Sequence, residues 1–481
     1  MTANPILTRE RNQLMQVRYL AQTAFAALML SQSACMIAAA DETGPALKVH
    51  TSLIASDGYM FGFPILLMEE TRRAASEVPY LCGLGGPINT FTHKFTPPDP
   101  QFRAVVRPNV DTLYSSAFLD LSKEPMVLSV PDVKDRFYLM AMLDAWTNNF
   151  AGPGTQSNGG KAATYLIAGP DWKTATPAGM IRIDAPTNLV WIIGRTELKG
   201  AGDIEAANKI QKLFRLSPLS GAVPLRSDEP CQSIADKTPP EDVVRSLSGV
   251  EFFTRLDALI ERYPPPSDDV SKLKKLGQIN VGPYARGEIE DLSASNKAAL
   301  ESGMAQGQKA IDAAFSFGSR SAWTPNPKII PLGDYGADYL IRAIVSQIGF
   351  GANKNEYAVY QNAKGTGNGK PLDGSVGTYE LRFKRGKTPP VSGFWSVTVY
   401  DQEGFLSANP ADRYALGSNS ELRADENGDI VIVFAPQKPS DVPAENWLPV
   451  PEGPFEVTLR MYWPNKDILD GKWTAPDIVR R

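Results

Sequence analysis

The sequence predicts a mainly β protein, α+β overall, in which two antiparallel β-sandwich-like domains are joined by a helical connector. From about residue 86 to about residue 200 it consists of short β-rich segments separated by Pro, Gly, Asn or Asp. Helical spacing of apolar residues follows until about residue 318, and short strands return from about residue 334. The expected parts are a signal peptide at 1–40, an N-terminal β domain at 41–202, the helical connector at 203–333 and a C-terminal β domain at 334–481.

The first forty residues have the composition of a secretory signal. Three arginines precede an apolar run at 19–30, and a run of three alanines ends at Ala40. This order of charged, apolar and small residues is typical of a cleaved signal peptide. We therefore expect cleavage near Ala40 and a periplasmic or secreted protein; an amphipathic or buried N-terminal helix is the alternative. The run is shorter than the roughly 20 residues that cross a bilayer, and no other stretch is expected to span one.

Three cysteines bear on the compartment. Cys35 raises lipid attachment as an alternative, although Gln32 stands where a lipoprotein signal normally has Leu. After signal cleavage, Cys82 and Cys231 remain, and an oxidising periplasm would permit a disulfide between them. Two unpaired buried thiols are the equal alternative.

The elements follow in order. Residues 46–76 are expected to form a helix, with Pro64 in its first turn or breaking it. In the first β domain, "FYLMAML" is apolar on both faces, as in an interior strand. The connector is expected to contribute three helical segments. In the second β domain, Asn427-Gly428 predicts a tight hairpin, because both residues tolerate positive φ; "DENGD" at 425–429 leaves a calcium loop as the alternative.

Composition narrows the function classes. The net charge of −4 is too small and of the wrong sign to indicate a nucleic-acid partner. His50 and His93 are the two histidines, so a His-rich zinc or iron site is not available. The sequence has no G-x-S-x-G, CxxC or Walker motif, and "GTGNG" at 365–369 leads into Pro371 rather than a helix. We expect neither a metal nor a cofactor.

The stretch "RPNVDTLYSSAFLDLS" at 107–122 holds the first candidate site. Asp111 opens a period-two face whose other members are Leu113, Ser115, Ala117, Leu119 and Leu121. Asn109, Thr112 and Tyr114 add polar groups beside it. A second polar group lies in "DAWTNNF", where Asp144, Trp146 and Asn148 are expected on one strand face and Thr147 and Asn149 on the other.

Two interpretations of these carboxylates remain open. A buried, unpaired carboxylate costs several kcal/mol, so each must be hydrogen-bonded, paired or protonated. On the structural interpretation, both cap turns or pair with Arg107 or Arg136. On the functional one, they share a polar pocket with Asp111, Asp144 and Tyr114 as catalytic residues, and with Asn109, Trp146 and Asn148 as binding residues.

The C-terminal domain has an aromatic and arginine cluster. Trp395, Arg460 and Tyr462 are its candidate binding residues, because aromatic rings beside an arginine can bind a sugar ring or an aromatic acid. On the last strand, Arg460 and Tyr462 are expected to face away from Leu459, Met461 and Trp463. The alternative is that the aromatic residues fill a β core.

Several motifs resemble one bacterial family. "VVRPNVDTLYSSAFLDLSKEPMVLSVPD", "RFYLMAMLDAWTNNFAGPGT" and "WIIGRTELKG" resemble the domain-of-unknown-function family 1254. "GANKNEYAVYQ", "YELRFKRGKTPPVSGFWSVTVYD" and "NWLPVPEGPFEVTLRMYWP" resemble its usual C-terminal partner, family 1214. The resemblance implies a mainly β, two-domain fold with a helical connector, and marks P-N-x-D-T-L-Y-S at 108–115 as a signature. It brings no accepted mechanism and therefore no catalytic residues.

Three functions remain open at this stage, and the sequence does not decide whether the protein is an enzyme. The first is an exported enzyme that uses acid–base chemistry, most simply hydrolysis, on a small or sugar-like molecule. The second is a non-catalytic envelope protein that binds a ligand or a partner. The third is a structural subunit whose aromatic residues make contacts in a homo-oligomer.

Overall fold

The N-terminal β domain is a sandwich of two sheets. The computed structural model describes residues 45–76, 85–103, 106–221, 238–316, 323–324 and 332–481. One sheet has the order β1-β2-β8-β4-β5, formed by Thr92–His93, Thr112–Asp120, Leu189–Glu197, Tyr138–Asp144 and Asn149–Ala151. The other has the order β7-β6-β3-β9, formed by Ile181–Asp184, Ala163–Ala168, Met126–Val130 and Arg215–Pro218. Apart from the parallel β6–β7 pair, neighbouring strands are antiparallel.

The core of this sandwich follows from strand alternation. Leu119 on β2, Leu128 on β3 and Met140 on β4 are fully buried between the two sheets. Strand β4 is buried on both faces, as expected for "FYLMAML", because its other face contacts the rest of the protein. The sandwich continues past the expected boundary at 202. Strand β9 pairs with β3, and the preceding helix α4, Ile204–Gln211, packs against the first sheet.

A block of helices forms a second core. It contains α2, α5, α6, α7, α8 and α9, which are Pro45–Ser76, Pro240–Arg245, Gly249–Arg262, Val270–Leu276, Ala294–Ser316 and Tyr339–Ile348. Short helices accompany them: α3 (Thr155–Asn158) and η1 (Ala201–Asp203) in the sandwich, and η3 (Ser267–Asp269), η4 (Gly277–Ile279) and η5 (Ile289–Asp291) in the block. Helix α2 runs between its partners: Tyr59 contacts Phe252 of α6, and Phe61 contacts Trp146. Helices α2 and α9 lie outside 203–318, where we expected the helices to gather, yet they share this core.

One sequence expectation about α2 was wrong. Pro64 lies in the interior of the helix and neither starts nor ends it, because packing on all sides of α2 outweighs the loss of one backbone hydrogen bond. The segment Lys48–Ser76 is long and apolar enough to cross a membrane by length and composition alone. However, most of its apolar stretch is buried inside the protein. A helix that is apolar all round is expected for such a core position.

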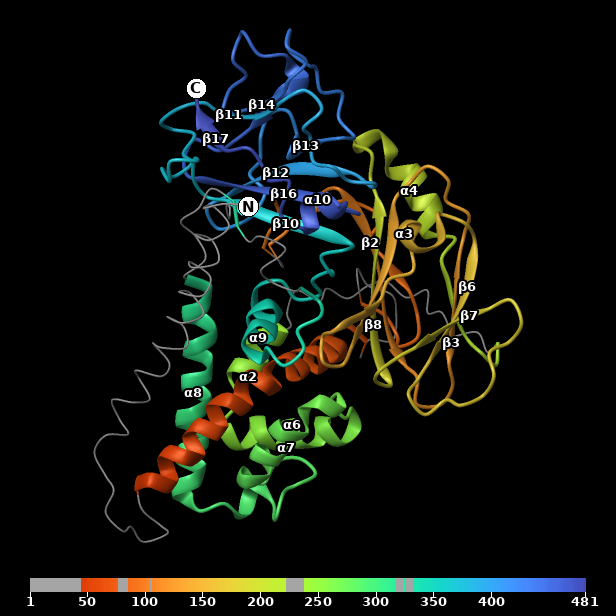
Figure 1. Cartoon of the computed structure of the whole chain (residues 1–481), viewed down its shortest axis with the longest axis vertical. Coiled ribbons are helices and arrows are strands. Elements are labelled where there is room, and N and C mark those ends of the chain that lie inside the picture. The colour runs from red at the N-terminus through yellow and green to blue at the C-terminus, as the bar shows by residue number, and fades with distance from the viewer. Residues whose placement is uncertain (1–44, 77–84, 104–105, 222–237, 317–322, 325–331) are drawn as a thin grey trace, which may run out of the picture. The chain divides into compact units, whose positions relative to one another are not determined.

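The C-terminal domain is a second sandwich (Figure 1). One sheet has the order β10-β16-β12-β13, formed by Ala358–Ala363, Phe455–Tyr462, Trp395–Asp401 and Ala415–Gly417. The other has the order β15-β14-β11-β17, formed by Trp447–Pro449, Ile430–Ala435, Tyr379–Phe383 and Ile478–Arg480. Short helices η6 (Ala444–Asn446) and α10 (Lys466–Leu469) complete it. The mainly β, α+β fold with two sandwiches is thus confirmed.

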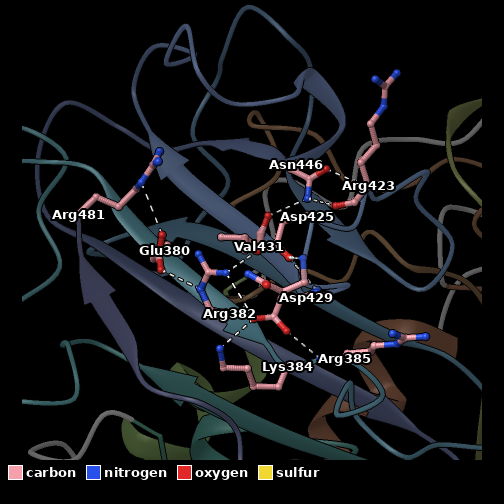
Figure 2. Close-up of polar contacts among 11 residues, drawn as sticks. Glu380, Arg382, Lys384, Arg385, Arg423, Asp425, Asp429, Val431, Asn446 and Arg481 are labelled. Carbon is pink, nitrogen blue, oxygen red and sulfur yellow. Dashed lines mark hydrogen bonds and ion pairs between the residues drawn. The ribbon is translucent and has the colours of Figure 1, made fainter.

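The hairpin expected at "DENGD" is present. Gly428 has φ of 80°, and the backbone N–H of Asp425 donates to Asp429 O over 2.9 Å. The Asp425 carboxylate accepts the N–H groups of Asn427 and Asp429, and Lys384 pairs with the Asp429 carboxylate at 2.9 Å. Figure 2 shows these carboxylates facing Arg382 of β11 and Lys384, the residue that follows the strand. The residues that could have formed a calcium loop are therefore engaged by the turn itself.

Several expectations concern residues outside the described ones. They are the signal peptide, the lipid attachment at Cys35, and the pairing of Cys82 with Cys231. Residues Thr51–Arg481 form one compact unit by their contacts, so the two sandwiches and the helical block pack against each other.

Candidate functional site

Asp111 does not lie on the strand face with Leu113, Ser115 and Leu119, where its period-two spacing had predicted it. Strand β2 begins one residue later, at Thr112, so Asp111 does not follow the strand alternation. Its carboxylate accepts a hydrogen bond from the Ser396 hydroxyl of β12, in the other sandwich. Its backbone N–H donates to Asn109 Oδ1 over 2.8 Å. The carboxylate that opens an apolar strand is therefore a contact to the C-terminal domain, and is not part of its own sandwich core.

The polar partner surface lies on one face of the C-terminal sheet. Ser396, Thr398 and Tyr400 alternate along β12, and Arg460 and Tyr462 lie on the neighbouring β16. Their intervening residues, among them Leu459 and Met461, fill the core of the sandwich. This arrangement confirms that Arg460 and Tyr462 face away from Leu459 and Met461. Period-two polar residues in "FWSVTVY" and "EVTLRMY" were the sequence signal for this buried polar face.

This face binds nearly every residue of the segment 107–111. The Arg460 guanidinium donates to Arg107 O over 3.0 Å, and Tyr400 donates its hydroxyl to Pro108 O over 2.7 Å. Asn109 Nδ2 donates to the Tyr462 hydroxyl over 2.8 Å. The Arg107 side chain pairs with the buried Glu456 of β16. The segment therefore joins the two domains through charged and neutral hydrogen bonds.

Burial governs the charge of Asp111. Its side chain is nearly enclosed, and burial raises the pKa of its carboxyl group. The Arg460 guanidinium and the Ser396 hydroxyl oppose this shift. Arg460 itself is satisfied by Thr398 Oγ1 at 2.8 Å and the Tyr400 hydroxyl at 2.6 Å.

Tyr114 belongs to a neighbouring group that the sequence analysis missed. The buried Arg195 of β8 lies over its ring, 5.4 Å from the centroid. Arg195 donates to Asn353 Oδ1 over 2.8 Å, and Asn353 Nδ2 donates to the Tyr360 hydroxyl over 2.8 Å. The signal available was Arg195 in the middle of the apolar segment "WIIGRTELKG", because an arginine in a buried strand needs partners.

Asp144 is a turn residue. Its carboxylate accepts the backbone N–H groups of Trp146 and Asn148, each over 2.9 Å, and the Asn148 side-chain amide over 3.0 Å. Thr147 has φ of 69°. The segment "DAWTNN" is thus the hairpin turn between β4 and β5, and the expected division of its residues between two strand faces was wrong. Burial raises the pKa of Asp144, and these hydrogen bonds oppose the shift.

The two carboxylates do not share a pocket. Thr112 pairs with Glu197 and Asp144 pairs with Val190, so the two sites lie seven residues apart along β8. At about 3.3 Å per residue, this puts them on the order of 20 Å apart at opposite ends of the sheet. The expectation of one pocket containing Asp111 and Asp144 was therefore wrong.

Two candidate binding tryptophans lie in cores. Trp146 is fully buried, contacts Phe61 with ring centroids 4.8 Å apart, and donates its indole N–H to Tyr263 O over 2.9 Å. Trp395 lies in the core of the C-terminal sandwich, 5.1 Å from the Phe383 ring. Both side chains pack inside the protein and away from the polar segment 107–111.

A serine–histidine contact also lies within the first sandwich. His93 Nδ1 is 2.8 Å from Ser115 Oγ, on the paired strands β1 and β2. Ser115 has no exposed surface and also accepts a hydrogen bond from Gln211. The pair therefore satisfies buried polar groups of the sheet. No three or more His, Cys, Asp or Glu side chains within the described ranges are arranged to hold a metal ion.

A cleft of about 320 Å³ lies between the two domains. Glu197 is one of its lining residues, and its carboxylate accepts the Phe137 N–H and the Asn419 side-chain amide, each over 2.7 Å. Arg136 donates to Glu197 O over 2.6 Å and pairs with Asp203. The lining residues are Lys134, Asp135, Arg136, Phe137, Thr155, Glu197 and Lys199 of the N-terminal domain, and Ser392, Gly393, Asn419 and Trp463 of the C-terminal domain.

Trp463 has an unusual backbone conformation in the wall of this cleft. Strand β16 ends at Tyr462, and Trp463 has φ of 52°. Its N–H donates to Tyr357 O, and its C=O accepts the Ser392 N–H, both over 2.8 Å. We had expected Trp463 on the same strand face as Leu459 and Met461. This was wrong, because the strand ends before Trp463. A bulky residue at positive φ costs on the order of 1–3 kcal/mol, and such strain tends to gather at functional sites.

None of the candidate residues from the sequence lines this cleft. Its lining comes mostly from loops of both domains, with Glu197 at the end of β8 and Thr155 at the start of α3. The packing of one domain on the other brings these residues together. The sequence contained Trp463 at the end of "LRMYW" and Arg136 before "FYLMAML", but no spacing connects them.

One solved structure shares this fold. No curated protein matches the chain. The VPA0106 protein from Vibrio parahaemolyticus is similar in structure, with a TM-score of 0.67 and 24% identity, over 90% of this chain and 100% of that chain. An uncharacterized protein from Burkholderia cenocepacia has a TM-score of 0.42 and 10% identity, over 90% of this chain and 96% of that chain.

Two family descriptions match the sequence. Residues 88–218 match "Protein of unknown function (DUF1254)", which covers the N-terminal sandwich through β9. Residues 357–466 match "Protein of unknown function (DUF1214)", which covers β10 through β16. The chain belongs to the two-domain family in which an N-terminal DUF1254 domain is followed by a C-terminal DUF1214 domain.

Proposed function

We propose that this protein binds a small polar molecule in the cleft between its two β domains and performs no chemistry on it. The observation that carries the proposal is the cleft itself, about 320 Å³ with a lining from both domains. Glu197 of one domain is held by Asn419 of the other, so the lining is complete only when the domains are packed together. The volume lies at the lower end of the range for small-molecule sites.

The geometry supports binding over the catalytic alternative. Hydrolysis by Asp111, Asp144 and Tyr114 needs these groups within hydrogen-bond reach of one bond. Asp111 and Asp144 lie at opposite ends of a sheet, and neither lines the cleft. The aromatic residues Trp395 and Tyr462 of the C-terminal cluster are buried within the chain, so they do not support the structural-subunit alternative.

We also propose that the protein is exported and meets its ligand outside the cytoplasm. Support comes from the charged, apolar and small-residue order of residues 1–40. Mass spectrometry of the protein purified from its native host should find an N-terminus near Asp41. An intact Met1 in a cytoplasmic fraction would contradict export and leave the binding proposal standing.

Thermal unfolding in the presence of small molecules tests the binding proposal. A panel of hexoses, hexuronates, dicarboxylates and amino acids should contain a compound that raises Tm, because a ligand of the folded state alone stabilises it by about 2.7 kcal/mol at a hundredfold excess over Kd. The variant Ser392→Trp places a large side chain in the cleft and should abolish the rise.

The control variant is Ser122→Trp, on an exposed turn of the N-terminal domain. It should retain the ligand-induced rise in Tm. The proposal is wrong if no compound of the panel raises Tm, or if the rise persists in a folded Ser392→Trp protein.

A further inference from the structure

We propose that the ligand of the cleft is an uncharged sugar ring, a hexopyranose. This inference rests on the proposed binding function and specifies its ligand class. Three features of the cleft carry it: an aromatic wall, hydrogen-bonding groups of both kinds, and a balance of charges around the lining.

The aromatic wall is Trp463. Its side chain is half-buried and packs against the cluster of Phe137, Phe394 and Tyr462. Two backbone hydrogen bonds hold the residue at positive φ. An indole fixed in this way offers a rigid flat surface with little conformational entropy to lose, and one face of a sugar ring carries C–H groups that pack on such a surface.

The hydrogen-bonding groups suit hydroxyls, which donate and accept at once. Asn419 uses its Nδ2 on Glu197, and no residue in the described part of the chain donates to its Oδ1. The Lys199 ammonium group donates to Asp135 O and keeps two further N–H donors. The Ser392 hydroxyl supplies a group of either kind. The cleft thus presents donors and acceptors side by side.

The charges around the cleft nearly compensate each other. The lining has three cations, Lys134, Arg136 and Lys199, and two carboxylates, Asp135 and Glu197. Arg136 is paired with Asp203, and Lys134 with Asp132. With these two partners, the three cations face four carboxylates, a net charge of −1. A uronate would add a second negative charge to a half-enclosed site, whereas a neutral ligand does not. The charges therefore favour an uncharged sugar over a sugar acid.

Matched probes separate the three features. Isothermal titration calorimetry on the full-length protein would compare glucose, galactose and mannose with their open-chain alditols and with glucuronate and galacturonate. At least one hexose should bind about tenfold or more tightly than its alditol, which has the hydroxyls without the ring, and than its uronate, which adds the charge.

Variants of Trp463 test the wall. Trp463→Asn removes the ring and keeps a residue that tolerates positive φ, so it should weaken hexose binding about tenfold or more. Trp463→Phe should retain part of the affinity. Trp473→Asn is the control, because Trp473 is also half-buried but bonds Lys387 O away from the cleft.

The outcomes distinguish this inference from the one on which it rests. If an alditol or a uronate binds as tightly as the best hexose, or if a folded Trp463→Asn protein binds unchanged, the hexopyranose inference is wrong. If a different panel compound binds and Ser392→Trp blocks it, the proposed function stands and the sugar inference falls. If nothing binds, both fall.

Discussion

At the residue scale, Asp111 and Asp144 show which contacts can be predicted from the sequence. Each buried carboxylate needed a hydrogen-bond partner, and each has one in the structure. The partners of Asp144 lie two and four residues away in the same turn, so the structural interpretation was accessible from local sequence. The hydroxyl that bonds Asp111 is 285 residues away on Ser396. No local pattern contains that information, because it depends on the packing of two domains.

The raised pKa of Asp111 predicts how the stability of the protein depends on pH. Burial raises the folded-state pKa above the ordinary value of 3.8, so the folded protein binds the proton more tightly than the unfolded chain does. The contribution of Asp111 to stability is then fully present below pH 3.8 and is lost as the pH rises through the raised value. Asp111→Asn mimics the protonated form, so it should be at least as stable as the wild type at pH 7.

Urea unfolding of the wild type, Asp111→Asn and Asp111→Ala at pH 4.5 and 7 measures this effect. Asp111→Ala should lose about 1–3 kcal/mol at both pH values, because the Ser396 hydroxyl loses its acceptor. If Asp111→Asn is strongly destabilised at pH 7 but not at pH 4.5, the carboxylate is ionised against Arg460 and the predicted direction is wrong.

At the element scale, periodicity predicted the strands well and the strand ends poorly. The alternation in "TLYSSAFLD" gives β2 and its buried face. The errors at "DAWTNN" and Trp463 have a common cause. Thr147 and Trp463 both have positive φ, which residue preferences assign to glycine or asparagine. Pro64 is a third case, since packing around α2 outweighs the local preference of proline.

The packing of α2 on α6 gives the second prediction. Gly62 lies where an added Cβ would be 2.6 Å from Leu256 Cδ2. Glycine to alanine normally stabilises a helix interior by roughly 0.5–1 kcal/mol, but Gly62→Ala should destabilise this protein by about 1–3 kcal/mol through overpacking. Leu256→Ala alone should cost about 2–5 kcal/mol.

A double-mutant cycle provides the control. In Gly62→Ala/Leu256→Ala the added methyl group enters the space that leucine leaves, so the combined loss in unfolding free energy should be smaller than the sum of the single losses. Additive losses would show that the two helices do not approach each other at Gly62 as closely as the structure has them.

At the scale of the whole molecule, the sequence predicted the fold class and the two sandwiches, but it did not predict how the two domains pack against each other. The signature P-N-x-D-T-L-Y-S resembled a pocket because it combined polar residues with a core strand. In the structure, those polar residues contact β12 and β16 of the other domain. In this chain, the signature residues therefore join the two domains.

The last prediction concerns the packing of the two β domains against each other. Arg460 donates hydrogen bonds to Arg107 O of the N-terminal domain and to Thr398 and Tyr400 of its own domain. Its positive charge also acts on the carboxyl group of Asp111. Removing one member of a buried charged network costs about 3–5 kcal/mol. Because Arg460 is a main contact between the domains, Arg460→Met should also uncouple them, so that calorimetry shows two separate unfolding transitions.

The control for Arg460→Met is Arg382→Met. Arg382 also pairs with carboxylates, Glu380 and Asp425, but on the sheet of β11 and with about a third of its side chain exposed (Figure 2). Pairs of this kind contribute about 0–1 kcal/mol, so the variant should keep the wild-type unfolding profile and the ligand-induced rise in Tm. Arg460→Met should lose that rise as well, since the cleft lining needs both domains in contact. A single transition in Arg460→Met with a loss below about 1 kcal/mol would show that Arg460 and the segment 107–111 do not hold the domains together.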